Sequence, residues 1–276
     1  MSNGALDLRD VKGPSALGGG TRRAAELLYL LASTEFKRTY FGTVLGYLWS
    51  LCRPLLLFAV LLEVFTHVVR LGAHVRNYPV LLLLNIVLFG FFQESTNAAV
   101  PSIVSQEAVV RKTQFPRLVI PLAVVTTALF NLAINLIVVF AFVVVYGIAP
   151  TWTWLLLPIV VGAFLVLAAA VSMLVSSLYP RFRDTAIIWA VLSTALFYAT
   201  PVLYPLQRLH GTFRTLVAMN PLTLPLELAR RWVIDPHAPI DTTTVPVAVP
   251  AAIAFAVIAV AIWVFNREAP RIAEEL

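Results

Sequence analysis

Six apolar segments, separated by short charged or proline-containing stretches, dominate this sequence. They cover residues 44–68, 78–100, 118–146, 152–178, 185–203 and 245–265. A helix needs about 20 mainly apolar residues to cross the hydrocarbon core of a bilayer. Overall, 60% of the residues are hydrophobic and only 12% are charged, whereas a soluble domain carries about 25% charged residues. We therefore predict an all-α membrane protein with six transmembrane helices.

The basic residues are distributed unevenly between the two sides of this predicted bundle. With six crossings, both termini lie on one side of the membrane. Only six of the 20 Lys and Arg residues fall on the other side, namely Arg70, Arg76, Arg208, Arg214, Arg230 and Arg231. Because cytoplasmic loops carry the excess of Lys and Arg, we predict that both termini are cytoplasmic. This placement also accounts for the net charge of +6 without a nucleic-acid partner.

The segment before the first span predicts a surface helix. Residues 1–21 are polar and predict a flexible cytoplasmic tail, and residues 266–276 predict a second, short tail. Residues 22–43 mix leucines with charged side chains, among them Glu35, Lys37 and Arg38. Such a mixture is typical of an amphipathic helix that lies in the membrane interface.

Two compact charged segments lie on the predicted cytoplasmic side. Residues 102–115 predict a short surface helix that stops before Pro116, because a residue that precedes proline is disfavoured in helical conformation. Residues 179–184 predict a tight turn between the fourth and fifth spans. Rigid charged loops of this kind suit the docking of a soluble partner. A charge cluster that only stops membrane insertion is the alternative.

The long segment 204–244, between the fifth and sixth spans, contains two apolar patches that are each too short to cross a bilayer. Asn220-Pro221-Leu222 separates them and is a turn signal. We expect two short helices that enter the outer half of the membrane, shielded by protein. An ordinary loop on the membrane surface is the alternative.

No catalytic or metal-binding pattern is visible. The four histidines lie far apart, with no H-x-x-x-H pair, and no serine lies in a G-x-S-x-G context. The phosphate-binding pattern G-x-x-x-x-G-K-[ST] is also absent. We predict that this chain has no catalytic residues, no metal site and no nucleotide-binding loop of its own.

Several polar and aromatic residues within the spans are candidates for a hydrated path. Glu94 lies in the second span, and Asn131 and Asn135 share one face of the third. They either line a channel or hydrogen-bond neighbouring helices. Arg53 either faces a channel or extends to the interface. The remaining candidates for this path lie either at the membrane interface or in a channel wall. They are Trp49, Tyr198, Tyr204 and Asn220.

Five motifs occur in one order along the chain: FKRTYFGTVLGYLWSLCRPLL (36–56), VVRKTQFPRLVIPLAVV (109–125), LYPRFRDT (178–185), TPVLYPL (200–206) and MNPLT (219–223). Together they resemble the membrane subunits of bacterial ATP-binding-cassette exporters of the ABC-2 type. The likeness is to the polysaccharide exporters for O-antigen, teichoic acid and related cell-wall glycans, and it extends from about residue 22 onward.

The resemblance implies roles for the predicted elements. Residues 22–43 would be the interface helix beside the ATPase, residues 102–115 the coupling helix, and residues 204–233 the outer gate helices. It also implies contacts with the ATPase at Glu107, Arg111, Lys112, Phe115, Arg117, Arg181, Arg183 and Asp184. The chain would form half of a homodimeric pore and work with two copies of a separate ATPase, which binds ATP and Mg²⁺.

The implied cargo is a lipid-linked polysaccharide that crosses the bacterial inner membrane. Two rival hypotheses stay open from the sequence. One is an ABC-2 exporter of drugs or other small amphiphiles, against which the aromatic residues and the interface helix weigh. The other is a membrane-embedded transferase that acts on lipid carriers, which the missing acid–base and metal patterns disfavour.

Overall fold

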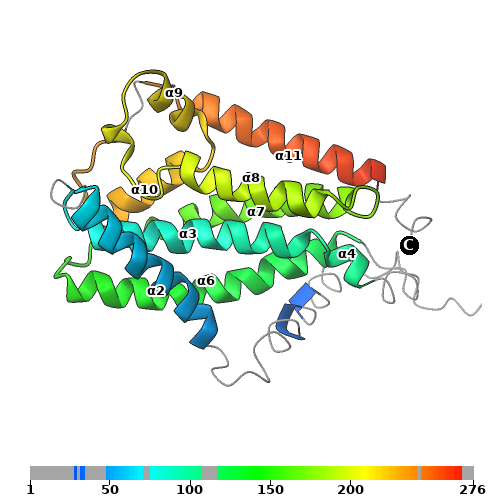
Figure 1. The fold of residues 1–276 in the computed structure, drawn as a ribbon, viewed down its shortest axis with the longest axis horizontal. Helices are drawn as coiled ribbons and strands as arrows, with labels where there is room; N and C mark the ends of the chain where they lie inside the picture. Colours follow the sequence, from blue (N-terminus) through cyan, green and yellow to red (C-terminus); the bar gives the residue numbers. More distant parts are fainter. Residues whose placement is uncertain are drawn as a thin grey trace, which may run out of the picture.

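The protein is a bundle of helices (Figure 1). This computed structural model describes residues 28–29, 32–34, 48–70, 75–106, 117–240 and 244–268, and these contain no β-strand. Five helical stretches are long and apolar enough to cross a membrane. They are α2 with the π-helical turn η1 (Leu48–Val68), α3 (Tyr78–Ala99), α6 (Val119–Val145), η3 with α7 (Trp152–Leu178) and α11 (Ala248–Glu268).

The sixth apolar segment forms a shorter helix than the sequence predicts. Helix α8 covers Thr185–Ala199, which is 15 residues, instead of the expected 185–203. At 1.5 Å per residue it is about 22 Å long, against about 30 Å for the hydrocarbon core. Thr200 is already extended, with φ −103° and ψ 148°, because the next residue is Pro201 and disfavours a helical neighbour. Helix α8 therefore does not cross a bilayer by itself.

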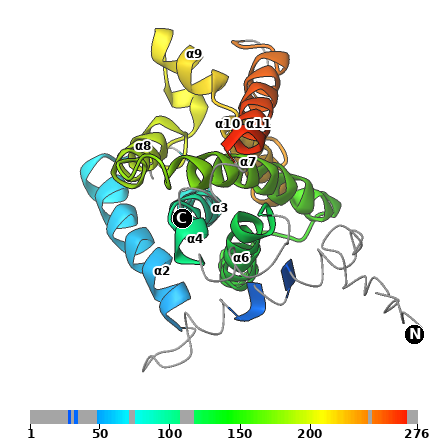
Figure 2. The ribbon, with the colours of Figure 1, turned by 90° about the vertical axis from the view of Figure 1, so that its right-hand side faces the viewer.

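Helix α3 is the centre of the bundle. Viewed along the bundle, it is surrounded by α2, α6, α7 and α8 (Figure 2). In its most apolar stretch 78% of the residues are buried, compared with 6% for Leu48–Val68 and 17% for α11. Leucine and phenylalanine side chains all around α3 pack into one continuous core. Helices α2 and α11 lie on the outside.

Three short elements cover one end of the bundle, which we call the outer end after the predicted topology. They are η4 (Leu206–Arg208), α9 (Gly211–Met219) and α10 (Thr223–Val233). Helix α10 packs on α7, α3 and η3, and α9 lies beside the start of α11 (Figure 1). Asn220 forms the turn between α9 and α10, because its Oδ1 accepts the Leu222 N–H at 3.0 Å. Two short helices thus occupy the predicted gate region, and their role stays a prediction.

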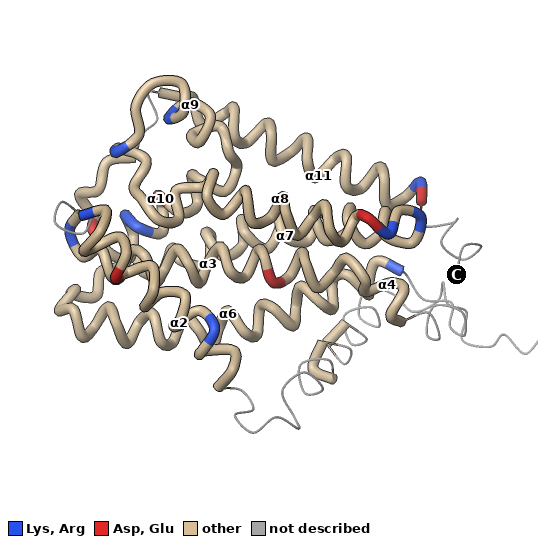
Figure 3. Tube along the Cα trace, in the orientation of Figure 1, with Lys and Arg blue, Asp and Glu red and all other residues tan. Residues whose placement is uncertain are grey.

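The opposite, inner end carries the short helix α4 (Ser102–Ser105) and the turn between α7 and α8. Charged residues gather at the two ends of the bundle, with few between them (Figure 3). Only residues 102–106 of the predicted coupling helix are described. Four predicted contacts with the ATPase lie outside the described residues, namely Glu107, Arg111, Lys112 and Phe115.

Part of the predicted interface helix packs against α6. The described residues 28–29 and 32–34 are helical. The Tyr29 ring meets Phe130 edge-on at 6.4 Å, and the Thr127 hydroxyl donates to the carbonyl of the buried Ala32 at 3.2 Å. Three predicted charged residues of this helix lie outside the described residues, namely Glu35, Lys37 and Arg38.

Candidate functional site

A cavity of about 950 Å³ lies between α2, α3, α6 and α8. We call it the cleft. It is bounded by aromatic and aliphatic side chains, among them Trp49, Phe91 and Phe197, together with a set of polar residues. Polar groups in an apolar bundle are costly unless they meet water, each other or a polar ligand. The cleft is therefore the first candidate for a functional site.

One face of α3 supplies most of the polar wall. Gly90, Gln93, Glu94 and Asn97 all line the cleft, and their spacing of three and four residues places them on one side of a helix. The Gly90 Cα faces open space, since an added Cβ would meet no atom within 4 Å. Sequence reasoning identified Glu94 alone. Gln93 and Asn97 could have been found from their helical spacing to Glu94 and Gly90.

Two asparagines on α6 connect this wall to its neighbours. Asn131 Nδ2 donates to Glu94 Oε1 at 2.5 Å, which joins α6 to α3. Asn135 Nδ2 donates to the Asn131 carbonyl at 2.9 Å and to the Ser50 carbonyl on α2 at 3.3 Å. Both asparagines are buried, and Asn135 also lines the cleft. Helix–helix bonding thus accounts for Asn131, whereas Asn135 both bonds and faces the cleft.

Helix α2 supplies the only positive charge among the described lining residues. Trp49 and Arg53 are one helical turn apart and both line the cleft. Their side chains are exposed rather than packed. Arg53 and Glu94 thus present opposite charges from facing helices to a shared space. Such a space, with amides, one charge of each sign and aromatic rings, can hold a hydroxyl-rich ligand by hydrogen bonding and stacking.

Helix α8 supplies the third wall through Ala190, Thr194 and Phe197. On the side of α8 that meets α3, Asn97 Nδ2 donates to Ser193 Oγ at 3.3 Å. Tyr198, the next residue after Phe197, is exposed and does not line the cleft.

The two remaining channel candidates, Tyr204 and Asn220, lie at the outer end. The Tyr204 hydroxyl donates to the Tyr198 carbonyl at 2.7 Å. Asn220 Nδ2 donates to Thr200 Oγ1 at 2.8 Å. Both residues hold the chain that follows α8, and neither lines the cleft.

The described inner-end residues form a small cluster of charges and rings. The Arg181 guanidinium lies 5.3 Å from the centre of the Phe182 ring and 4.0 Å from Glu268. The Arg183 guanidinium lies 5.0 Å from the centre of the Tyr179 ring. These cation–π contacts stiffen the turn. Asp184 immediately precedes α8, where a negative charge favours the helix dipole.

Arg117 is the last of the predicted contacts with the ATPase. Its Nη1 is buried without a hydrogen-bond partner in the described part of the chain. A buried guanidinium N–H that lacks an acceptor is costly. Among the described residues, this donor is therefore buried and unsatisfied where the chain enters α6.

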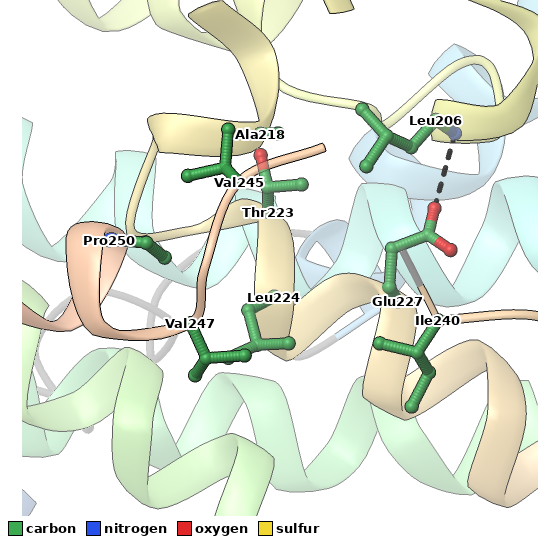
Figure 4. Close-up of a pocket in the computed structure, with 9 residues that line it drawn as sticks. All are labelled: Leu206, Ala218, Thr223, Leu224, Glu227, Ile240, Val245, Val247 and Pro250. Carbon is green, nitrogen blue, oxygen red and sulfur yellow. Dashed lines mark hydrogen bonds between the residues drawn. The ribbon is translucent and has the colours of Figure 1, made fainter. Parts of the chain in front are cut away.

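A second polar cluster at the outer end was not predicted. Glu227 on α10 is 5% exposed and accepts the Leu206 N–H at 3.2 Å and Gln207 Nε2 at 3.0 Å. Arg230 Nη1 donates to Gln207 Oε1 at 2.9 Å and lies 3.9 Å from Glu227. The adjoining pocket (Figure 4) holds about 20 Å³, roughly the space of one water. The cluster therefore braces η4 on α10. The pocket beside it is too small to hold a ligand.

Comparison with known proteins adds independent information. The family described as "ABC-2 type transporter" matches residues 26–232. An O-antigen export system permease protein, RfbA, from Myxococcus xanthus is 33% identical over 71% of this chain and 75% of its own length. The protein of the same name from Klebsiella pneumoniae is 30% identical over 71% of this chain and 76% of its own. The polysialic acid transport protein KpsM of Escherichia coli is 22% identical over 71% and 77%.

Proposed function

This chain belongs to the ABC-2 type transporter family, and from that premise we propose that it is the membrane subunit of an exporter that moves a lipid-linked polysaccharide out of the cytoplasm. The relatives named for O-antigen export and polysialic acid transport support a glycan as cargo. The observation that carries the proposal is the cleft of about 950 Å³, polar and aromatic inside an apolar bundle.

The cleft has the chemistry that a sugar polymer requires. Hydroxyl groups can hydrogen-bond the side chains of Gln93, Asn97 and Asn135, and the flat faces of sugar rings can stack on Trp49. These interactions are individually weak and repeat along a polymer. A chain of sugars could therefore advance without being held in one register. The relatively few charges favour a cargo recognised by hydroxyl groups.

A second copy of the chain would complete the conduit. The surfaces of α2 and α8 that flank the cleft expose apolar side chains, among them Leu56, Val60, Ile188 and Val191. A polar path that opened sideways into lipid would be unfavourable. Two copies that meet through these helices would enclose the polymer between them.

The driving force would come from a separate ATPase at the inner end, in two copies. Arg117, Arg181, Arg183 and Asp184 lie there with α4, which contains the first residues of the predicted coupling helix 102–115. ATP and Mg²⁺ would bind to the partner, and this chain would transmit motion without catalysis. Closure of the ATPase dimer would push on the inner ends of the helices and change the width of the cleft.

The proposed function implies one orientation of the chain in the membrane. The chain would be a multi-pass protein of the bacterial inner membrane with six crossings, of which α8 together with the residues after it makes one. Both termini would be cytoplasmic. The excess of basic residues on that side supports the assignment.

Depletion of the protein in its own host tests the proposal. Lipid-linked glycans are extracted after depletion and then sized. We expect one polymer to accumulate inside the cell and to disappear from the surface, with recovery when the wild-type chain is restored. Unchanged glycans together with altered sensitivity to amphiphilic drugs would contradict the proposal and favour the small-molecule exporter.

A further inference from the structure

The chain that follows α8 loses its helical structure inside the protein. Thr200, Val202 and Leu203 are all buried, yet Thr200 is extended. The carbonyls of residues that follow the end of a helix have no partner within that helix. In a membrane such groups must be satisfied by the protein itself, because lipid offers no hydrogen bonds.

Helix α3 satisfies these carbonyls with two buried side chains. Asn85 Nδ2 donates to the carbonyl oxygens of Pro201 and Val202, both at 3.2 Å. The Tyr78 hydroxyl donates to the Leu203 carbonyl at 2.8 Å. Asn85 lies seven residues into α3, or about 10 Å from its outer end at 1.5 Å per residue. Residues 200–203 are therefore held at membrane depth by the central helix.

The same residues also hold the outer helices. Thr200 Oγ1 accepts from Asn220 Nδ2 in the turn between α9 and α10, at 2.8 Å. Thr200 Oγ1 in turn donates to the Leu196 carbonyl in the last turn of α8, at 2.7 Å. One short segment thus connects the wall of the cleft, the central helix and the outer helices.

The rest of α8 has few buried residues. Only Ser193 and Phe197 are buried along its 15 residues. Ser193 makes a hydrogen bond to Asn97 on α3 at 3.3 Å, near the upper limit of length for such a bond. Two ring contacts also join α8 to α3, namely Phe197 with Phe89 at 5.3 Å and Trp189 with Phe92 at 6.4 Å. Among the hydrogen bonds from α3 to α8 and residues 201–203, the one from Tyr78 to the Leu203 carbonyl is the shortest, at 2.8 Å.

We propose that Tyr78 and Asn85 are positioning residues that fix residues 200–203 between α8 and the outer short helices. In this proposal the outer end of α8 stays in place while its inner part moves away from α3. Residues 200–203 are the pivot of this motion, and the motion changes the width of the cleft. The bonds themselves are independent of cargo. The expected effect on transport rests on the proposed function, in which the polymer passes through the cleft.

The test compares Asn85→Leu and Tyr78→Phe, singly and together, with the wild-type chain in its assembled transporter. Hydrogen exchange is measured on peptides that cover residues 196–206 and 220–223. We expect faster exchange there in the double variant and unchanged exchange in α6, α7 and α11. We also expect glycan export in the host to fall at least roughly tenfold in the double variant, because it loses three buried hydrogen bonds and the loss of one corresponds to about a tenfold change in an equilibrium constant.

Thr96→Val is the matched control, because Thr96 is a buried hydroxyl on the same helix whose bonds go to the Phe92 and Gln93 carbonyls of α3 itself. It should change neither measurement. Asn85→Ser keeps a donor and should restore part of the loss seen in Asn85→Leu. If the double variant fails to fold, Tyr78→Phe alone removes one bond and is used instead.

Two results would overturn the inference. One is unchanged exchange over residues 196–206 in the double variant, which would mean that the bonds do not hold this segment. The other is locally faster exchange with full export, which would mean that the segment positions nothing that transport needs. A failure of the proposed function would look different, because the wild-type chain would then export no glycan while the exchange differences persisted.

Discussion

Single residues set the width and the polarity of the cleft. Gly90, Gln93, Glu94 and Asn97 form one polar stripe on α3, and each has a distinct local environment. Glu94 is held by Asn131, Asn97 meets Ser193, and Gly90 leaves open space. Substitutions along this one stripe should therefore separate effects on transport from effects on folding.

Gly90 gives the cleanest separation. Gly90→Ala should raise the free energy of unfolding by about 0.5–1 kcal/mol, because glycine in a helix loses more backbone entropy than alanine. Gly90→Trp should fill the cleft and abolish glycan export, while the protein still accumulates in the membrane. Thermal unfolding in detergent and glycan sizing in the host check the two expectations. Normal export by Gly90→Trp would exclude the cleft as the path.

The bond between Glu94 and Asn131 should matter for stability. Asn131→Leu removes the buried donor of the hydrogen bond to Glu94 Oε1, and a typical intramolecular hydrogen bond contributes about 0.5–1.5 kcal/mol to stability. Glu94→Gln keeps an acceptor for Asn131 and should leave the unfolding temperature near that of the wild type. Equal unfolding temperatures for the two variants would show that this bond contributes nothing.

At the scale of elements, the central position of α3 determines which helices can carry the site. Helix α3 contacts α2, α6, α7 and α8, and it supplies both the polar stripe and the two donors that hold residues 201–203. Peripheral α2 and α8 form the other walls. The cleft thus lies between the buried central helix and helices at the periphery.

The brace between α10 and η4 gives a prediction for one element. Glu227→Ala should lower the free energy of unfolding by about 1–3 kcal/mol, because the Leu206 N–H and the Gln207 amide lose their buried acceptor. Glu63→Ala is the control, since Glu63 pairs with His67 on the surface and exposed pairs contribute little. Chemical unfolding measures both. A smaller loss for Glu227→Ala than for Glu63→Ala would contradict the brace.

Much of the helical layout was predictable from the sequence, and the exceptions have physical causes. The predicted spans 78–100 and 152–178 agree with α3 and with η3–α7 within a residue, because long apolar runs have few alternative structures. Helix α8 is shorter than the predicted span 185–203, since Pro201 follows its last turn closely and ends the helix. The central burial of α3 was not predictable, because α2 is as apolar as α3 and only packing distinguishes them.

The candidate site was predictable in part. Trp49, Arg53, Glu94 and Asn135 were named as polar or aromatic residues in the predicted spans, and all four line the cleft. The contacts of Glu227 were not foreseen, because Gln207 lies 20 residues away and no local pattern connects the two.

On the scale of the whole molecule, the open side of the cleft predicts how two copies meet. In a Cys52→Ser background, Val191→Cys on α8 should form a cross-linked dimer in native membranes, because α8 would face its counterpart. Phe255→Cys on α11 is the control, because Phe255 is more exposed than Val191 but lies on another side of the bundle. Gel electrophoresis without reductant checks both. Dimers through Phe255 and none through Val191 would place the interface elsewhere.

The most direct measurement of the central claim is photo-cross-linking inside the cleft of the working transporter. A photoreactive amino acid replaces Gln93 in the cleft or, as the control, Ile159 on the exposed face of α7. Growing cells are then illuminated. We predict a ladder of glycan adducts on this chain from position 93 and none from position 159. Lipid adducts alone at position 93, in cells that export glycan normally, would contradict passage of the polymer through the cleft.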